Sequence, residues 1–243
     1  MFSHIYIYKP QRLVMKSKVL MLALAAATIS LTSKAQSKAG DATTTFGIRA
    51  GVNFTNVTGK DQAGNDLSND KLKTGFNIGV NAEIPIAPDF YIQPGLLFST
   101  KGAKIKNGSS SDYKVNLSYL ELPVNLLFKP ELGTGKLLIG FGPYIAYAIG
   151  GKVKGYNNKD QDITFDKSVT ATEYLNVGNP YGLLKRFDAG GNFLLGYETS
   201  SKISIQFNGQ LGMTKINPEI EGVSNDHTKY KNLGVGVSLG YRL

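Results

Sequence analysis

The chain ends in the stretch Leu233-Gly-Val-Gly-Val-Ser-Leu-Gly-Tyr-Arg-Leu243, in which large apolar side chains alternate with glycine, serine and arginine. Side chains repeat every two residues along a β-strand, so this stretch predicts a strand with one apolar face and one small or polar face. In a soluble protein the apolar face would pack on a core. The same alternation recurs about seven more times upstream, which predicts a closed barrel whose apolar face contacts lipid and whose polar face points inward.

The alternating segments predict eight strands, at residues 45–57, 72–85, 89–104, 113–129, 136–150, 186–199, 201–214 and 233–243. The connections near residues 87–88, 133–135 and 200–201 are short, whereas those at 58–71, 105–112, 151–185 and 215–229 are longer and polar. The predicted fold is therefore all-β: an eight-stranded antiparallel transmembrane β-barrel with short periplasmic turns and longer outer loops. A soluble β-sandwich, which also has several short alternating strands, is the alternative.

One strand departs from the simple alternation. Val115 and Leu117 are out of phase with the apolar set that runs from Leu120 to Phe128. If apolar side chains mark the lipid face, the phase must change between the two sets. The sequence therefore predicts a β-bulge near Ser118.

The N-terminus predicts a signal peptide at residues 1–35. Lys16 and Lys18 precede an apolar stretch at 19–31, and Ser33-Lys34-Ala35 has small residues at the two positions that a signal peptidase reads. Met15 is an alternative start, which would make residues 1–14 an upstream extension. A membrane anchor is disfavoured because a spanning helix needs roughly 20 apolar residues. Residues 36–44 are a short N-terminal segment, and residues 45–243 are the predicted outer-membrane β-barrel domain.

Composition excludes several kinds of chemistry. Removing the signal takes away five basic residues and no acid, so the formal charge falls from +9 to +4, and we predict no nucleic-acid partner. Cysteine is absent, which excludes disulfides, thiolate metal sites and thiol catalysis. We predict no cofactor, metal site or catalytic residue. An enzyme would have to rely on His227, which lies beside Ser224 and Asp226 in a polar loop.

Charged residues on the predicted inner face are the first candidate site. They should pair, because a charge inside a narrow barrel is costly unless it is neutralised and hydrogen-bonded. We expect one group toward the periplasmic end, formed by Arg49, Glu83, Glu198 and Arg242. A second group should lie higher, with Tyr144 as a partner, and is formed by Glu121, Arg186 and Asp188. Two interpretations stay open: a packed polar plug, or a narrow conduit with a proton-linked gate.

The long segment 151–185 is the second candidate site. It carries Tyr156, Phe165, Tyr174 and Tyr181 among polar neighbours. Aromatic residues in an exposed loop often mark a partner site, although they also serve to pack a loop on itself. We expect that deleting this loop spares barrel folding and abolishes partner binding.

Several stretches resemble the PorT-like outer-membrane β-barrel family. They are Phe46-Gly-Ile-Arg-Ala-Gly-Val-Asn-Phe54, Tyr91-Ile-Gln-Pro-Gly-Leu-Leu-Phe-Ser-Thr-Lys-Gly-Ala103, Tyr119-Leu-Glu-Leu-Pro-Val-Asn-Leu-Leu-Phe-Lys129, Gly140-Phe-Gly-Pro-Tyr144, Arg186-Phe-Asp-Ala-Gly-Gly191 and the terminal strand. The resemblance covers most of residues 45–243 and implies a small outer-membrane barrel. Some members of that family are linked to a protein-secretion and gliding machinery.

These observations predict a non-enzymatic protein of the outer membrane of a Gram-negative bacterium, exported through the inner membrane. The expected role is structural or surface-binding through the outer loops, including that of an accessory of a secretion or assembly machinery. The expected partners are outer-membrane lipid, the barrel-assembly machinery for insertion, and a protein bound by the outer loops. The alternative is a narrow channel or transporter for a small solute or hydrophobic molecule.

Overall fold

The computed structural model describes residues 43–67, 71–107, 110–223 and 226–243. The chain divides into the units Met1–Thr44 and Thr45–Leu243. The predicted signal peptide at 1–35, and all but the last two residues of the segment 36–44, lie outside the described residues. Every helix and strand of the described residues belongs to the second unit.

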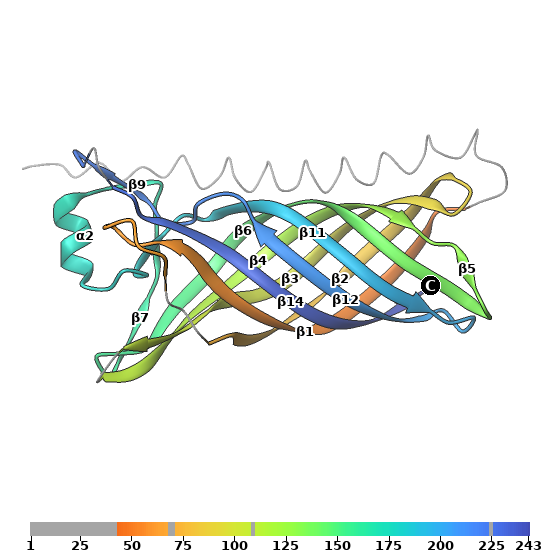
Figure 1. Cartoon of the computed structure of the whole chain (residues 1–243), viewed down its shortest axis with the longest axis horizontal. Helices are drawn as coiled ribbons and strands as arrows, with labels where there is room; N and C mark the ends of the chain where they lie inside the picture. Colours follow the sequence, from red (N-terminus) through yellow and green to blue (C-terminus); the bar gives the residue numbers. More distant parts are fainter. Residues whose placement is uncertain (1–42, 68–70, 108–109, 224–225) are drawn as a thin grey trace, which may run out of the picture. The chain divides into compact units, whose positions relative to one another are not determined.

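Eight long strands pair in a closed ring within the described residues (Figure 1). Each strand is antiparallel to both neighbours, and the order around the ring is β1–β2–β3–β4–β6–β11–β12–β14, with β14 returning to β1. Their bounds are β1 Thr45–Lys60, β2 Lys73–Ala87, β3 Phe90–Asn107, β4 Ser110–Phe128, β6 Gly135–Tyr156, β11 Phe187–Glu198, β12 Ile203–Gly212 and β14 Lys229–Arg242. The predicted eight-stranded antiparallel barrel is confirmed.

The two faces of the terminal strand behave as its alternation predicts. In β14, Leu239 is 62% exposed on the outside of the ring, whereas Ser238 is 1% exposed on the inside. Aromatic pairs also lie on the outer face, with Phe90 stacked on Phe128 near one end and Phe76 beside Phe98 nearer the other. The fold therefore presents apolar side chains outward and buries polar ones. In the described part of the chain, none of the helices is long and apolar enough to cross a membrane.

One end of the barrel is closed by tight turns. The turns that follow β2, β4 and β11 each contain a residue with positive φ, namely Asp89, Gly133 and Lys202. A short strand, β5 (Glu131–Leu132), pairs with the start of β6. This end, at the right of Figure 1, also holds the start of β1 and the end of β14, and is called the turn end below.

The other end carries the long connections, although β1, β6 and β14 extend into the predicted loops, to Lys60, to Tyr156 and from Lys229. The sequence predicts a loop at residues 105–112, but β3 continues to Asn107 and β4 starts at Ser110, so these strands project as a hairpin. The connections from β6 to β11 and from β12 to β14 form a cap, whose elements are β7 Lys159–Asp162, β8 Thr164–Phe165, β9 Ser168–Thr170, α2 Ala171–Val177, β10 Leu183–Leu184 and β13 Glu219–Glu221. In the cap, β8 pairs with β10 and β9 pairs with β13.

The irregularity predicted near Ser118 is present, but its cause differs. The register between β4 and β6 shifts between Ser118 and Tyr119, because Ile149 of β6 is the extra residue. The inner face of β4 keeps its phase, and Val115 and Leu117 are completely buried inside the ring. Apolar side chains therefore do not always mark the lipid face in this chain: the inner face becomes apolar toward the cap.

Candidate functional site

Four charged side chains form a buried network near the turn end, called the turn-end network. Lys129 Nζ lies 2.8 Å from Glu83 Oε2 and 2.8 Å from Glu198 Oε1. Arg242 pairs with Glu83 through Nη2, and its Nε lies 3.8 Å from Glu198 Oε2. Arg242 Nη1 also donates a hydrogen bond to Asn81 at 2.8 Å. Two cations and two carboxylates neutralise each other here, which makes their burial tolerable.

A second cluster, the middle network, lies nearer the cap. Lys101 Nζ lies 2.8 Å from Glu121 Oε1 and 3.6 Å from Asp188 Oδ2. The same ammonium group lies 4.5 Å from the centre of the Tyr144 ring, and the Tyr144 hydroxyl donates to Asp188 at 3.2 Å. Asn232 Nδ2 donates to Asp188 at 2.9 Å. Because these residues come from β3, β4, β6, β11 and β14, the network ties opposite walls of the barrel together.

A small cavity borders the middle network at Glu121. It has a volume of about 30 Å³, which is room for about one water molecule. Its lining is mostly polar and includes Arg49, Asn53, Asn77, Ser99, Glu121, Asn208 and Gln210. Arg49 Nε is buried without a hydrogen-bond partner in the described part of the chain. Arg49 and Glu121 line the same cavity, which places a second cation near one carboxylate of the middle network.

Amide side chains fill the barrel beside the networks. Asn125 Nδ2 donates to Gln93 Oε1 at 3.1 Å, and Asn192 Nδ2 donates to Asn125 and, at 3.1 Å, to the carbonyl of Gly142. Gln93 in turn donates to Glu83 at 3.3 Å. The polar interior is thus cross-linked from β2 to β11. Of the two interpretations left open by the sequence, this packing favours the polar plug.

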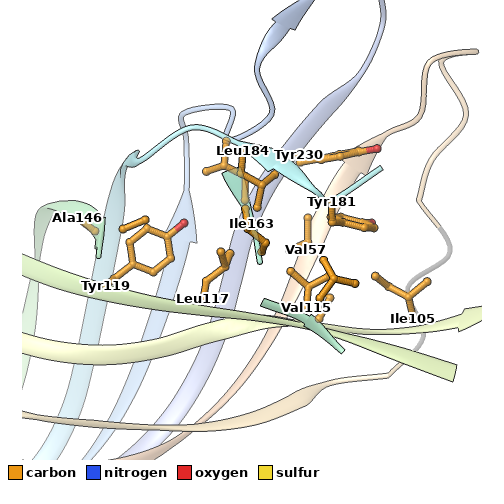
Figure 2. Packing of buried hydrophobic residues seen from close by; sticks show 14 of the residues in the cluster. Val57, Ile105, Val115, Leu117, Tyr119, Ala146, Ile163, Tyr181, Leu184 and Tyr230 are labelled. Carbon is orange, nitrogen blue, oxygen red and sulfur yellow. The ribbon is translucent and has the colours of Figure 1, made fainter. Parts of the chain in front are cut away.

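Above the middle network the interior becomes apolar (Figure 2). Strand residues and cap residues share one buried cluster, which includes Val57, Val115, Leu117, Tyr119, Ile163, Tyr181, Leu184, Ile216 and Tyr230. The rings of Tyr181 and Tyr230 stack with their centres 5.0 Å apart. Burial of apolar surface is the main force that holds such a cluster together. The cap therefore closes the barrel mouth as a hydrophobic seal.

The aromatic residues proposed as a partner surface belong mostly to this seal. Tyr181 is only 3% exposed, and Tyr156 and Phe165 pack against the same cluster. Tyr174, on α2, packs against a smaller cluster of the cap. Tyr181 is therefore not displayed, and Tyr156 and Phe165 are only partly exposed, because these side chains help to cover the apolar inner faces of the strands at the barrel mouth. The loop packs on the barrel, not only on itself.

Most predicted interior residues lie inside the ring, but Arg186 does not. Glu83, Glu198 and Arg242 form the turn-end network, and Glu121, Asp188 and Tyr144 form the middle network. Arg49 differs in grouping, since its side chain reaches the cavity beside Glu121 rather than the turn-end carboxylates.

Arg186 is exposed and lies just before β11 begins. Its Nη1 donates to the Ala148 carbonyl at 3.0 Å, and its guanidinium stacks 4.7 Å from the centre of the Phe165 ring. The interior at this level is filled by apolar residues such as Ala148 and Leu184, which offer a charge no partner. Arg186 therefore does not belong to the interior network, which corrects the expectation from the sequence.

Sequence reasoning missed the two lysines at the centre of the networks. Lys101 and Lys129 were not among the predicted interior charges, although each forms two ion pairs there. A signal existed: Lys101 lies two residues after the inward Ser99, and Lys129 lies four residues after the inward Asn125. Counting charges would also have helped, because the predicted upper group held two carboxylates, Glu121 and Asp188, and one cation, Arg186.

Two carboxylates in the cap have lowered pKa values. Thr170, the N-cap of α2, donates its backbone N–H to Glu173 at 2.8 Å, and this bond holds the pKa of Glu173 below its usual value. Lys185 Nζ donates to Glu219 at 3.0 Å and lowers the pKa of that carboxyl. A carboxyl group whose pKa is lower in the folded chain than in the unfolded chain stabilises the fold at pH values above its unfolded-state pKa. This contribution is lost as the pH falls through the folded-state pKa. Both contacts therefore favour the cap at neutral pH.

The remaining chemical candidates show no assembled site. His227 is exposed, and the Asp226 carboxylate accepts a hydrogen bond from the Thr228 backbone at 2.9 Å. Ser224, the third member of that candidate set, lies outside the described residues. Among the residues that the structure describes, no group of three or more histidine, aspartate or glutamate side chains is placed to hold a metal ion.

The model of the outer membrane protein beta-barrel domain family matches residues 34–217. The matched region stops before β14, which closes the ring by pairing with β1 and β12. No curated protein matches the chain.

Two solved structures show similarity. One is Ail, the attachment invasion locus protein of Yersinia pestis, in complex with the heparin analogue sucrose octasulfate; it has 12% identity and a TM-score of 0.39, with 82% of this chain and 99% of Ail covered. The other is the outer membrane protein OprG from Pseudomonas aeruginosa, with 11% identity, a TM-score of 0.43, and 82% of this chain and 95% of OprG covered.

Proposed function

Because the chain belongs to the outer membrane protein beta-barrel domain family, we propose that it is a non-enzymatic surface protein that acts through its outer cap and not through its interior. The filled interior carries this proposal. The carboxylates of both networks are buried in ion pairs with lysine or arginine side chains, and the cavity beside the middle network has a volume of about 30 Å³. A hydrated solute or a hydrophobic molecule would need a path through both networks and through the apolar seal.

The proposed contact surface is the exposed part of the cap, formed by α2, β9 and β13. None of the residues of α2 is buried, and Leu175 at its centre is 76% exposed. Lipid explains exposed apolar side chains on the barrel wall, but α2 lies in the cap. Covering this exposed leucine with a partner would remove its apolar surface from water, which favours binding. Tyr174 and Val177 of the helix pack on the smaller cap cluster of Val169, Leu183 and Ile220, which holds the helix in place.

The PorT-like resemblance of the sequence supports a partner within the cell envelope, such as a component of a secretion or assembly machinery. The predicted signal peptide and insertion by the barrel-assembly machinery belong to the same proposal. They describe how a chain of this kind reaches the outer membrane with its cap outside.

Planar bilayer recordings test the choice between surface protein and channel. The purified full-length protein should insert and give no stable unitary conductance. In cells, a photo-crosslinking residue at Leu175 should form an adduct with an envelope protein, whereas one at Leu239, on the lipid face, should not. Stable unitary conductance that changes on Glu121→Gln would contradict the proposal and place the path through the middle network.

A further inference from the structure

A row of lysines crosses the outside of the barrel near the cap. The backbone pairing sets Lys71 opposite Lys104, Lys104 opposite Lys114, and Lys114 opposite Lys154. Four basic residues on neighbouring chain segments thus lie at one level, at the outer ends of β3, β4 and β6 (lower left in Figure 1). Lys152 lies two cross-strand pairs below, opposite Asn116.

The protein itself neutralises this row only in part. Asp112 pairs with Lys71 at 2.9 Å and with Lys104 at 3.7 Å. Lys114 and Lys154 are both exposed and form no ion pair with the carboxylates of the described residues. Like charges directly opposite each other on a sheet are destabilising. The row therefore retains a positive charge that an anionic partner would neutralise.

The position of the row indicates which anion it would meet. Along the same strands, Phe98, Leu120 and Tyr147 form the last apolar trio of cross-strand neighbours on the lipid face. On β3 and β4 the row lies six residues beyond this trio, which is about 14 Å along the membrane normal for strands tilted near 45°. The headgroup layer of an ordinary bilayer extends only about 5–8 Å beyond the hydrocarbon. The lysines therefore lie at the level of groups carried above a simple phospholipid headgroup.

We propose that the row Lys71, Lys104, Lys114 and Lys154 binds the phosphate groups of a glycolipid of the outer leaflet, whose sugars carry phosphates away from the acyl chains. Charge complementarity and depth both favour this occupant. Basic residues next to a membrane attract anionic lipid by about 1 kcal/mol each. This inference relies on outer-membrane placement and not on the proposed partner of the cap.

The test uses the full-length protein and the double variant Lys114→Gln/Lys154→Gln, which removes the two lysines that lack a carboxylate partner. A matched control, Lys159→Gln/Lys167→Gln, removes two exposed lysines of the cap. Binding is measured to vesicles that contain purified phosphorylated lipopolysaccharide and to vesicles with its dephosphorylated form. We expect the double variant to bind the phosphorylated vesicles about 30-fold more weakly than wild type does. The control should bind these vesicles as tightly as wild type. All three proteins should bind the dephosphorylated vesicles equally weakly.

A second measurement keeps the test valid if binding is weak. In detergent alone, the double variant should resist thermal unfolding at least as well as wild type, because repulsion in the row is relieved. Adding phosphorylated lipopolysaccharide should then raise the unfolding temperature of wild type more than that of the double variant. Equal binding by the double variant and the control would overturn the proposal. Tighter binding of the lysine row to a soluble polyanion than to the lipopolysaccharide vesicles would overturn the proposal as well. The row would then be a binding surface for a free acidic polymer.

Discussion

At the scale of single residues, the barrel interior is governed by charge balance. Each network holds carboxylates that would be strongly destabilising if they were buried alone. Lys129 lies between two of them and Lys101 between two others, so each lysine holds together side chains from different strands. The sequence predicts which strand faces carry charge, but it does not give the level at which long side chains meet. For this reason the sequence predicts Arg49 near Glu83, whereas its side chain lies beside Glu121.

Replacing Lys129 tests this balance. Lys129→Met leaves Glu83 and Glu198 with Arg242 alone, and we expect it to destabilise the barrel by about 3–5 kcal/mol. Urea unfolding of the refolded protein in detergent, followed by the heat-induced shift of the band on a gel, measures the change. Adding Glu198→Gln should restore charge balance and recover part of the loss. Lys159→Met, at an exposed lysine, is the matched control. An equal loss of stability in the two methionine variants would refute the claim that Lys129 stabilises the barrel by neutralising buried carboxylates.

At the scale of elements, β4 shows why alternation alone is incomplete. Its inner face is polar at Asn125 and charged at Glu121, and it becomes apolar at Leu117 and Val115. The sequence pattern predicts the strand and an irregularity near Ser118. It does not predict that the apolar inner residues are covered by a loop far away in the chain. That contact depends on Ile163, Tyr181 and Leu184, which no local pattern connects with β4.

The cap should open as a unit when its seal is weakened. Tyr181→Ala removes the ring that stacks on Tyr230 and contacts Tyr113. We expect limited proteolysis within the segment 157–186 to become at least about tenfold faster, because a loss of only 1.4 kcal/mol raises the open population tenfold. The strands of the barrel should remain protected.

Leu175→Ala, at the exposed centre of α2, is the control and should leave the cleavage rate unchanged. Deleting the loop 151–185 is a harsher change than the sequence suggested, because it would uncover Val57 and Val115 at the barrel mouth. Cleavage of Tyr181→Ala at the wild-type rate would mean that the seal does not depend on this contact.

At the scale of the whole molecule, one rule accounts for most of what the sequence predicted. A period of two, repeated along the chain, indicates all eight strands, their order of pairing and the outward apolar face. The pattern did not predict that Tyr181 of the candidate partner loop is buried at the barrel mouth. An aromatic residue in a long loop is equally compatible with display and with sealing, and only the apolar strand ends opposite the loop decide between them.

The central claim is that the alternating apolar faces contact lipid while the interior is filled. Because the chain has no cysteine, a single cysteine can carry a fluorescent label without interference. Labels at Phe207→Cys in β12 and Leu239→Cys in β14 should be strongly quenched by brominated lipids after reconstitution of the full-length protein, whereas a label at Thr172→Cys in α2 should not. Equal, weak quenching at all three positions would contradict the claim, since the apolar faces would then pack against protein.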